Sequence, residues 1–416
     1  MKKEKLVPEI RFKGFEEDWR NKKIESFGIW LPGTSLENQF CKNGSHKVVN
    51  IGSFGPDFMY KDQGLRINLN DENKHFLLKK DDLVMILNDK TLEGRIIGSV
   101  LLIDKDNTYL YNQRIQRLSI DKLNYNPHYL FSLINNMRNH DILYKKSQGN
   151  TQIYLNWSVV SKINFLVSEQ LDEQQKIGTF FSNLDSFIQS QKLKLKKLNE
   201  VKQSFLSKMF ASENQKFPEI RFKGFKEEWK LTTFDELINF ASEGGTPSTF
   251  NNEFYKNGNI PFIKIEETKN KYIFDAEIYI NIHGINNSSA WVIPPNSILL
   301  TNGATIGNVA INKKEICTKQ GILGIIPSLS MDLEFFYYLL KNKYFQKELK
   351  NKSVTGTFAS ISLPIIKTIL LSVSQKDEQQ KIGQFFLNLD SLIQSQELKL
   401  EKLNNIKQAL LEKMFC

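Results

Sequence analysis

Residues 172–210 read DEQQKIGTFFSNLDSFIQSQKLKLKKLNEVKQSFLSKMF, and residues 377–415 read DEQQKIGQFFLNLDSLIQSQELKLEKLNNIKQALLEKMF. The two stretches are identical at 29 of 39 positions. A repeat of this kind makes one structural unit recur along the chain, so it has to be recognised before the fold is interpreted. The chain of 416 residues is therefore one unit written twice.

Both stretches carry a heptad seam, because their apolar residues recur at alternating spacings of four and three. The full seam is Ile177, Phe181, Leu184, Ile188, Gln191, Leu195, Leu198, Lys202, Phe205 and Met209, repeated as Ile382, Phe386, Leu389, Ile393, Gln396, Leu400, Leu403, Lys407, Leu410 and Met414. A helix of 39 residues is about 58 Å long and cannot bury such a stripe alone. We expect an antiparallel coiled-coil pair whose seam contains Ile188, Leu195, Leu198, Phe205, Ile393, Leu400, Leu403 and Leu410.

Four polar residues occupy matching seam positions, Gln191 with Gln396 and Lys202 with Lys407. Buried polar residues in a coiled-coil seam commonly fix its register and orientation. The alternative is that these side chains lie at the edge of the seam, in water.

A shorter repeat stands before each divergent segment. Residues 8–20 read PEIRFKGFEEDWR and residues 218–230 read PEIRFKGFKEEWK, with ten of 13 positions identical. The segments that follow show little identity. The predicted division is lead-in segments at 1–20 and 211–230, inserts at 21–171 and 231–376, and long helices at 172–210 and 377–416.

Both inserts mix strand and helix signals, which predicts one shared α+β domain with two different surfaces. In the first insert we expect strands at Leu83–Leu87, Ile96–Ile103 and Ile115–Ile120, then a helix from Pro127. In the second, Asn302-Gly303 between Ser297–Thr301 and Thr305–Ile311 predicts a hairpin, and Asp332–Leu349 predicts an amphipathic helix. The predicted fold class is thus α+β, two such domains joined by the helix pair, with a pseudo-twofold repeat.

The charge of the chain favours a polyanionic partner. Net charge is +10 with a pI of about 9.1. Residues 20–171 carry 20 basic and 15 acidic side chains, and residues 230–376 carry 15 and 12, so most of the excess lies on the inserts. No run approaches the roughly 18 apolar residues that span a bilayer. Cys41, Cys317 and Cys416 are far apart, and we expect a cytoplasmic location with no membrane association.

Motifs for chemistry are missing from the sequence. It contains no glycine-rich phosphate loop ending in Gly-Lys-Ser/Thr and no GxGxxG between a strand and a helix. The histidines and cysteines have no metal-ligand spacing. The Asn-Pro-Pro-aromatic tetrapeptide typical of DNA amino-methyltransferases is absent. The carboxylates are scattered, and their pattern alone does not exclude an acidic nuclease centre. We therefore expect no catalytic residues, no metal and no cofactor on this chain.

Loops in the inserts carry side chains suited to base edges, since Arg suits guanine and Asn or Gln suits adenine. The candidates for DNA contact are Arg95, Gln113, Arg114, Gln148, Asn150 and Thr151 in the first insert, and Gly244, Gly245, Thr246, Ser248, Asn302, Gly303 and Thr305 in the second. The alternative for each glycine-rich loop is that it is simply a turn.

This arrangement resembles the specificity subunit of type I restriction–modification systems over nearly the whole chain. The resemblance is carried by the lead-in patterns Arg11–Trp19 and Arg221–Trp229, by the Glu-Gln-Gln-Lys-Ile openings at Glu173–Ile177 and Glu378–Ile382, and by Gly244–Ser248, Gly258–Phe262, Gly303–Gly307 and Asn112–Arg114. Two departures stand out. No proline-rich run precedes either helix opening, and the first insert has Leu31-Pro32-Gly33-Thr34-Ser35 in place of Gly-Gly-Thr-Pro-Ser.

The resemblance implies a division of labour. Each insert would be a target recognition domain that reads one half of a split site in double-stranded DNA. The paired helices would set the gap and dock two modification (methyltransferase) subunits, and restriction subunits would join that core. S-adenosylmethionine, ATP and magnesium would be bound by the partner subunits. Two rivals remain at this point, a sequence-specific regulator that binds DNA alone and a self-contained nuclease or methyltransferase.

Overall fold

The structure is a computed structural model, and it describes residues 7–55, 57–90, 93–213, 215–354 and 359–415. Residues 1–6 of the first lead-in segment and Cys416 therefore lie outside the described residues. The chain divides into two compact units. Unit 1 comprises residues 1–192 and 398–416, and unit 2 comprises residues 193–397. Each unit contains one insert, the beginning of one long helix and the end of the other.

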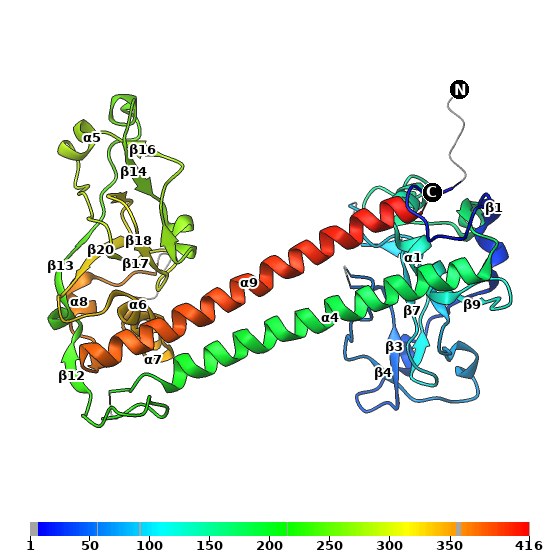
Figure 1. Cartoon of the computed structure of the whole chain (residues 1–416), viewed down its shortest axis with the longest axis horizontal. Helices are drawn as coiled ribbons and strands as arrows, with labels where there is room; N and C mark the ends of the chain where they lie inside the picture. The colour runs from blue at the N-terminus through cyan, green and yellow to red at the C-terminus, as the bar shows by residue number, and fades with distance from the viewer. Residues whose placement is uncertain (1–6, 56, 91–92, 214, 355–358, 416) are drawn as a thin grey trace. The chain divides into compact units, whose positions relative to one another are not determined.

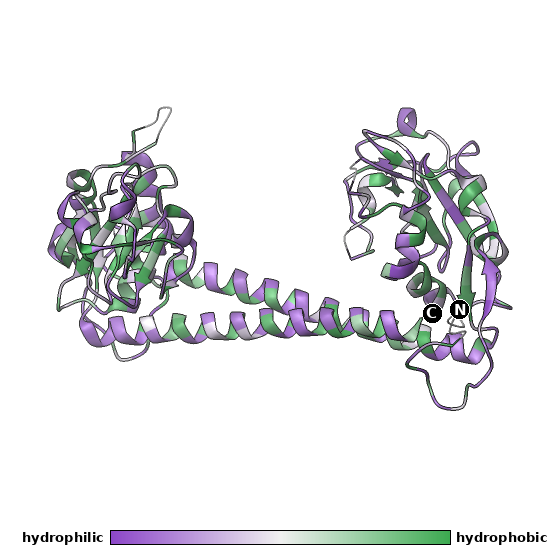
Figure 2. Cartoon of the chain, turned by 90° about the horizontal axis from the view of Figure 1, so that it is seen from above, coloured by the Kyte–Doolittle hydropathy of each residue, from purple (hydrophilic) through white to green (hydrophobic). Residues whose placement is uncertain are grey.

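The two long helices are confirmed. Helix α4 spans Leu171–Lys208 and helix α9 spans Lys376–Met414 (Figure 1). Along both helices hydrophobic residues alternate with hydrophilic ones (Figure 2). Every residue of the predicted seam is buried or half-buried in both helices, including Ile188, Leu195, Leu198, Phe205, Ile393, Leu400, Leu403 and Leu410. The heptad pattern thus identified the less exposed stripe correctly.

Each unit packs the start of one helix against the end of the other, so the helices run antiparallel. In unit 1 the core holds Ile177 and Phe181 together with Leu411, Met414 and Phe415. In unit 2 the equivalent core holds Ile382 and Phe386 together with Leu206, Met209 and Phe210. The same sequence repeat therefore produces the same packing twice.

The two lysines of the seam each form an ion pair with an aspartate of the other long helix. Lys202 forms an ion pair of 2.6 Å with Asp390 in unit 2. Lys407 forms the equivalent pair of 2.5 Å with Asp185 in unit 1. All four side chains are 20–25% exposed. Each lysine is thus neither isolated in the seam nor free in water, because it joins the two helices by charge.

The insert of unit 1 is built on a four-stranded sheet in the order β2-β9-β5-β7 beside a three-stranded sheet β4-β3-β8. The strands are β1 (Arg20–Lys23), β2 (Gly28–Pro32), β3 (His46–Val49), β4 (Arg66–Ile67), β5 (Leu83–Ile86), β6 (Asn88–Asp89), β7 (Val100–Leu102), β8 (Tyr109–Tyr111), β9 (Ile115–Ile120), β10 (Ile153–Tyr154) and β11 (Asn164–Val167). The helices are α1 (Pro127–Asn135), α2 (Met137–Tyr144) and α3 (Trp157–Val160).

The insert of unit 2 repeats this topology despite its different sequence. Its main sheet has the order β13-β20-β17-β18-β15 and its second sheet β16-β14-β19. The strands are β12 (Lys230–Thr233), β13 (Ile238–Glu243), β14 (Ile260–Ile263), β15 (Tyr272–Ile273), β16 (Tyr279–Ile280), β17 (Ile298–Thr301), β18 (Val309–Asn312), β19 (Cys317–Thr318), β20 (Ile322–Pro327) and β21 (Leu370–Val373). The helices are α5 (Ile282–Asn286), α6 (Leu333–Lys341), α7 (Lys343–Lys352) and α8 (Leu363–Lys367). The shared α+β fold of the inserts is thereby confirmed.

Three secondary-structure predictions need correction. Asp332–Leu349 is two helices, because buried Asn342 adopts an extended conformation and caps α7 through the backbone N–H of Phe345. The predicted hairpin is confirmed, since β17 and β18 pair antiparallel, but its loop runs from residue 302 to 308 and is not the two-residue turn Asn302-Gly303. The expected strand at Ile96–Ile103 is confined to Val100–Leu102, and Gly98 before it has a positive φ of 74°.

The two ends of each insert are paired with one another. Strands β1 and β11 pair antiparallel, with Arg20 opposite Val167. Strands β12 and β21 do the same, with Lys230 opposite Val373. The chain therefore leaves and rejoins its repeated segments at one place, and the insert between can differ without displacing them.

Candidate DNA interface and its helix frame

The repeated residues of unit 1 converge on one buried carboxylate, Glu173, in the first turn of α4. Arg11 donates from Nε and Nη2 to its two oxygens at 2.6 and 3.0 Å. Trp19 Nε1 donates at 3.1 Å and Ser168 Oγ at 2.5 Å. The side chain of Glu173 is fully buried. A bidentate guanidinium with two further donors satisfies a carboxylate that burial would otherwise disfavour.

Unit 2 builds the same cluster around Glu378. Arg221 donates from Nε and Nη2 at 2.7 and 2.8 Å, and Trp229 Nε1 donates at 3.1 Å. Hydrogen bonding to Glu378 raises the pKa of Arg221 above its ordinary value. The Arg…Trp pattern of the lead-in segments and the glutamate of the helix opening are thus one structural device, formed twice.

The glutamine after each glutamate fixes the insert to the helix. Gln174 accepts from the backbone N–H of Asn126, the N-cap of α1, at 2.9 Å. Gln379 accepts from the backbone N–H of Asp332, the N-cap of α6, at 2.8 Å. Both contacts use the backbone of the insert, so they place no demand on its side chains.

A glycine in each long helix permits this close approach. A Cβ on Gly178 would lie 2.5 Å from Asn126 Oδ1 and 2.8 Å from the backbone nitrogen of Tyr129. A Cβ on Gly383 would lie 2.8 Å from Asp332 Oδ1 and 3.0 Å from the nitrogen of Phe335. The one glycine that both helices share is therefore required by packing, although glycine is a weak helix former.

The first-insert candidates gather around residues 87–89. Arg114, exposed and with a φ of +66°, accepts from the backbone N–H of Leu87. Strand β6 pairs with β10, which closes the hairpin containing Gln148, Asn150 and Thr151. A Cβ on Gly94 would meet Ile153, so the loop carrying Arg95 lies against that hairpin. Gln113, Arg114, Arg95 and the 148–151 loop therefore share one end of the sheet.

Three of these side chains already have partners within the unit. Gln148 Oε1 accepts from Tyr154 Oη at 3.2 Å. Arg95 forms an exposed ion pair of 2.6 Å with Glu93. Gln113 Nε2 donates to Glu37 at 2.9 Å, as does buried Asn112. Hydrogen bonds from Ser35 first, and then from Asn112 and Gln113, lower the pKa of Glu37 to about 2. This carboxylate stays ionised at neutral pH and holds the 112–114 turn in place.

The second-insert candidates gather around Gly321 at the start of β20. Its carbonyl accepts from the backbone N–H of Asn302 at 3.0 Å and of Gly303 at 3.4 Å. Gly244 donates to the next residue, Ile322, at 2.9 Å. Thr246, Ser248 and Thr305 are partly or fully exposed in these loops. The structure therefore places the second set at the end of the sheet equivalent to that of the first.

Three of the second-insert candidates are fixed in the fold by burial or close packing. Asn302 is 5% exposed, and its side chain donates to the carbonyl of Ile361 at 3.2 Å. A Cβ on Gly244 would lie 2.2 Å from Thr318 Oγ1, and one on Gly245 would lie 2.2 Å from Ser289 Oγ.

Gly33 N–H donates to Ile115 as Gly244 does to Ile322, so Leu31–Ser35 is the counterpart of the glycine loop.

The candidate list from sequence missed Lys319 and Gln320. Lys319 N–H donates to Ile263 at 2.9 Å, as Asn112 N–H donates to Val49 at 2.9 Å. Both side chains are exposed, at the place that Asn112 and Gln113 hold in unit 1. The signal that could have found them is the spacing Gln-x-Ile, present at Gln113–Ile115 and at Gln320–Ile322.

Among the described residues, histidine, cysteine and carboxylate side chains form no group of three or more that could hold a metal ion. None of the helices in the described ranges has the length and apolarity needed to cross a membrane.

Comparison with known proteins confirms the resemblance drawn from the repeats. Residues 16–203 and 226–405 match the type I restriction modification DNA specificity domain. The type I restriction enzyme MjaIX specificity subunit of Methanocaldococcus jannaschii is 31% identical over 202 residues, which cover 48% of this chain and 46% of that protein. The EcoR124I/EcoR124II specificity subunit of Escherichia coli is 27% identical over 180 residues, 42% of this chain and 44% of that protein.

These matches cover about half the length of both curated relatives. Among solved structures, the S subunit of the type I restriction–modification system from M. genitalium covers 99% of both chains, with a TM-score of 0.62 and 18% identity. That likeness concerns the fold. Since the family match includes both inserts and most of both long helices, this chain belongs to the type I restriction modification DNA specificity domain family.

Proposed function

We propose that this protein is the DNA-recognition subunit of a type I restriction–modification complex. Each insert reads one half of a bipartite target in double-stranded DNA, and α4 and α9 set the gap between the halves. One observation carries the proposal. The two inserts share one topology but differ in sequence, and each is attached to its long helix by the same Glu-Gln pair, Glu173–Gln174 or Glu378–Gln379. Joining two readers in this way raises affinity when both half-sites are correctly spaced.

The exposed side chains of the two equivalent loop clusters are the proposed DNA contacts. They are Arg95, Gln113, Arg114, Gln148, Asn150 and Thr151 in unit 1, and Thr246, Ser248, Thr305, Lys319 and Gln320 in unit 2. These residues supply the amide, hydroxyl and basic groups that read base edges and phosphates. Gly244, Gly245, Asn302 and Gly303 are assigned to shaping the loops that present them.

Catalysis is assigned to partner subunits in this proposal, with the complex in the cytoplasm. Two modification subunits dock on the helices and bind S-adenosylmethionine, and restriction subunits join them and use ATP and magnesium. The direct test is methylation-sensitive sequencing of host DNA with the gene present and deleted. We expect a bipartite methylated motif with a fixed gap that disappears on deletion. Methylation unchanged by deletion would refute the proposal.

A repeated set of exposed apolar residues supports docking on the helices. Phe187, Leu193 and Val201 on α4 and Leu392, Leu398 and Ile406 on α9 are each 43–58% exposed. The two sets occupy equivalent positions of the repeat. Single exposed apolar residues are ordinary, but the same three exposed in both copies favour a surface that two identical partners cover.

Changing Leu193 and Leu398 to lysine should therefore weaken assembly. We expect the double variant to bind the modification subunit at least about tenfold more weakly, because two desolvated apolar contacts become charged. The measurement is affinity by titration calorimetry with the purified modification subunit. The matched control is Leu123→Lys with Leu329→Lys, since these leucines are 87% and 86% exposed on the inserts. Equal affinity for both double variants would contradict docking at this surface.

A further inference from the structure

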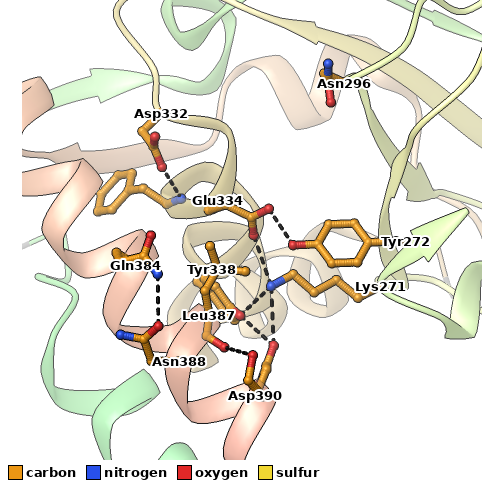
Figure 3. Close-up of polar contacts among 12 residues, drawn as sticks. Lys271, Tyr272, Asn296, Asp332, Glu334, Tyr338, Gln384, Leu387, Asn388 and Asp390 are labelled. Atoms are coloured by element: carbon orange, nitrogen blue, oxygen red, sulfur yellow. Dashed lines mark hydrogen bonds and ion pairs between the residues drawn. The ribbon is translucent and has the colours of Figure 1, made fainter. Parts of the chain in front are cut away.

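Unit 2 holds the edge of its sheet against helix α9 through one lysine, Lys271, directly before the edge strand β15 (Figure 3). Its Nζ lies 3.3 Å from Asp390 Oδ2 on α9 and 3.0 Å from Glu334 Oε2 on α6. It also donates to Tyr338 Oη at 2.5 Å. The ammonium thus links a strand, a helix of the insert and a long helix.

The ammonium of Lys271 and its two carboxylate partners are largely shielded from water. Its side chain is 14% exposed, and the carboxylates of Glu334 and Asp390 are 16% and 24% exposed. The rings of Tyr272, Tyr337 and Tyr338 lie 5.1, 4.9 and 4.3 Å from its Nζ. An ammonium between carboxylates and aromatic faces is stabilised by charge and by the ring quadrupoles.

Asp390 couples this contact to the helix pair. Its Oδ1 binds Lys202 of α4 at 2.6 Å, while its Oδ2 accepts from Tyr338 at 2.5 Å and faces Lys271. Burial acts to raise the pKa of Asp390, but hydrogen bonds from Lys202 and Tyr338 and the charge of Lys271 lower it overall. One carboxylate therefore connects both long helices and the recognition domain in unit 2.

Unit 1 provides an internal comparison, because within its described residues the main sheet has four strands and ends at β7. Next to the edge strand β7, unit 1 has a cavity of about 630 Å³ that Leu102 of that strand helps to line. Asp185, the repeat of Asp390, lines this cavity. His128 and Ser132 of α1 line it too, and they hold the positions in α1 that Glu334 and Tyr338 hold in α6. Among the described residues, the lysine contact to α9 is thus formed in unit 2, whereas unit 1 ties its insert to α4 through Asp57 and Lys192 at 2.9 Å.

We propose that Lys271 is a positioning residue that fixes the sheet edge of the second recognition domain to helix α9 and so sets the register in which that domain meets its half-site. This rests on the proposed function. Without the ammonium, the edge strand keeps the hydrogen bond from Tyr272 Oη to Glu334 Oε1 at 2.6 Å but loses its charge contact with Asp390 of α9, so this edge of the sheet is held less firmly to the long helix. The register of its half-site relative to the helices then broadens.

The test measures how much the affinity of the complex falls when the length of the gap between the half-sites changes. The variant Lys271→Met keeps the length of the side chain and removes the charge. Binding is measured for the complete complex on duplexes carrying the mapped target with its natural gap and with one base pair added or removed. We expect the wild-type complex to lose roughly tenfold or more in affinity when the gap changes, and the variant to lose less than about threefold.

Lys313→Met is the matched control. Lys313 Nζ also lies near the Tyr272 ring, 4.8 Å from its centroid, but it donates to Asn296 rather than to α9. It should retain wild-type gap discrimination, as should Lys271→Arg, which keeps the charge. Unchanged discrimination in Lys271→Met would overturn the proposal.

Hydrogen exchange on the isolated chain separates this proposal from the function on which it rests. Lys271→Met should speed exchange at residues 272–273 and 311–313, which pair at the sheet edge, while Lys313→Met should not. Unchanged exchange would overturn the tie to α9 even if the complex binds DNA as proposed. A wild-type complex that binds no bipartite target would refute the function and, with it, the register role, whatever the exchange shows.

Discussion

Replacing Glu173 with alanine should lower the free energy of unfolding of unit 1 by about 3–5 kcal/mol, the usual cost of removing one partner from a buried ion pair. The change leaves the guanidinium of Arg11 only 12% exposed and without its carboxylate. It also removes the acceptor of Trp19 Nε1 and Ser168 Oγ. Glu378→Ala should do the same to unit 2, through Arg221 and Trp229.

One matched control makes this prediction specific. Glu200→Ala removes an exposed glutamate of the same helix, whose ion pair with Lys196 is 3.8 Å long, and should change stability by less than about 0.5 kcal/mol. Thermal and urea unfolding monitored by circular dichroism supply the measurement. If the units unfold in separate transitions, Glu173→Ala should shift one and Glu378→Ala the other. A shift as small as that of Glu200→Ala would show that the repeated cluster is dispensable.

The two long helices could be predicted from sequence because their heptad pattern is local and periodic. The seam of α4 and α9 follows from spacing alone, and Pro127 marks the start of α1 as expected. The purpose of the repeated Arg, Trp and Glu could not be derived that way, since Arg11 and Glu173 are 162 residues apart in sequence. Only the tertiary fold brings such partners together.

The candidate DNA contacts stay predictions, because their placement depends on the tertiary fold. Asn302 looks like a base-reading side chain at a turn, but tertiary packing buries it against Ile361. Lys319 and Gln320 were not among the candidates because their placement depends on β14, the parallel neighbour of β19, which no local pattern reveals. Base specificity depends on such long-range placement of loops, whereas the helices depend on a repeat within one segment.

Exchanging residues 234–369 for the corresponding insert of another family member should change one half of the recognised sequence and leave the other half and the gap unaltered. The structure defines these limits, because they keep the paired strands β12 and β21 in the recipient. The anchor is kept as well. Gln379 binds the backbone of Asp332, so a foreign insert with any N-cap residue can occupy it.

The expected effect is large, because each mismatched base pair costs roughly 1–3 kcal/mol and a half-site contains several. Binding to the original target should fall below detection, and methylation mapping of cells that carry the chimera should show a new half joined to the old one. The reciprocal exchange of residues 24–163, between β1 and β11, should change the opposite half. Both halves changing in either chimera would mean that the two inserts read the DNA jointly, and the independence that their separate anchors predict would be wrong.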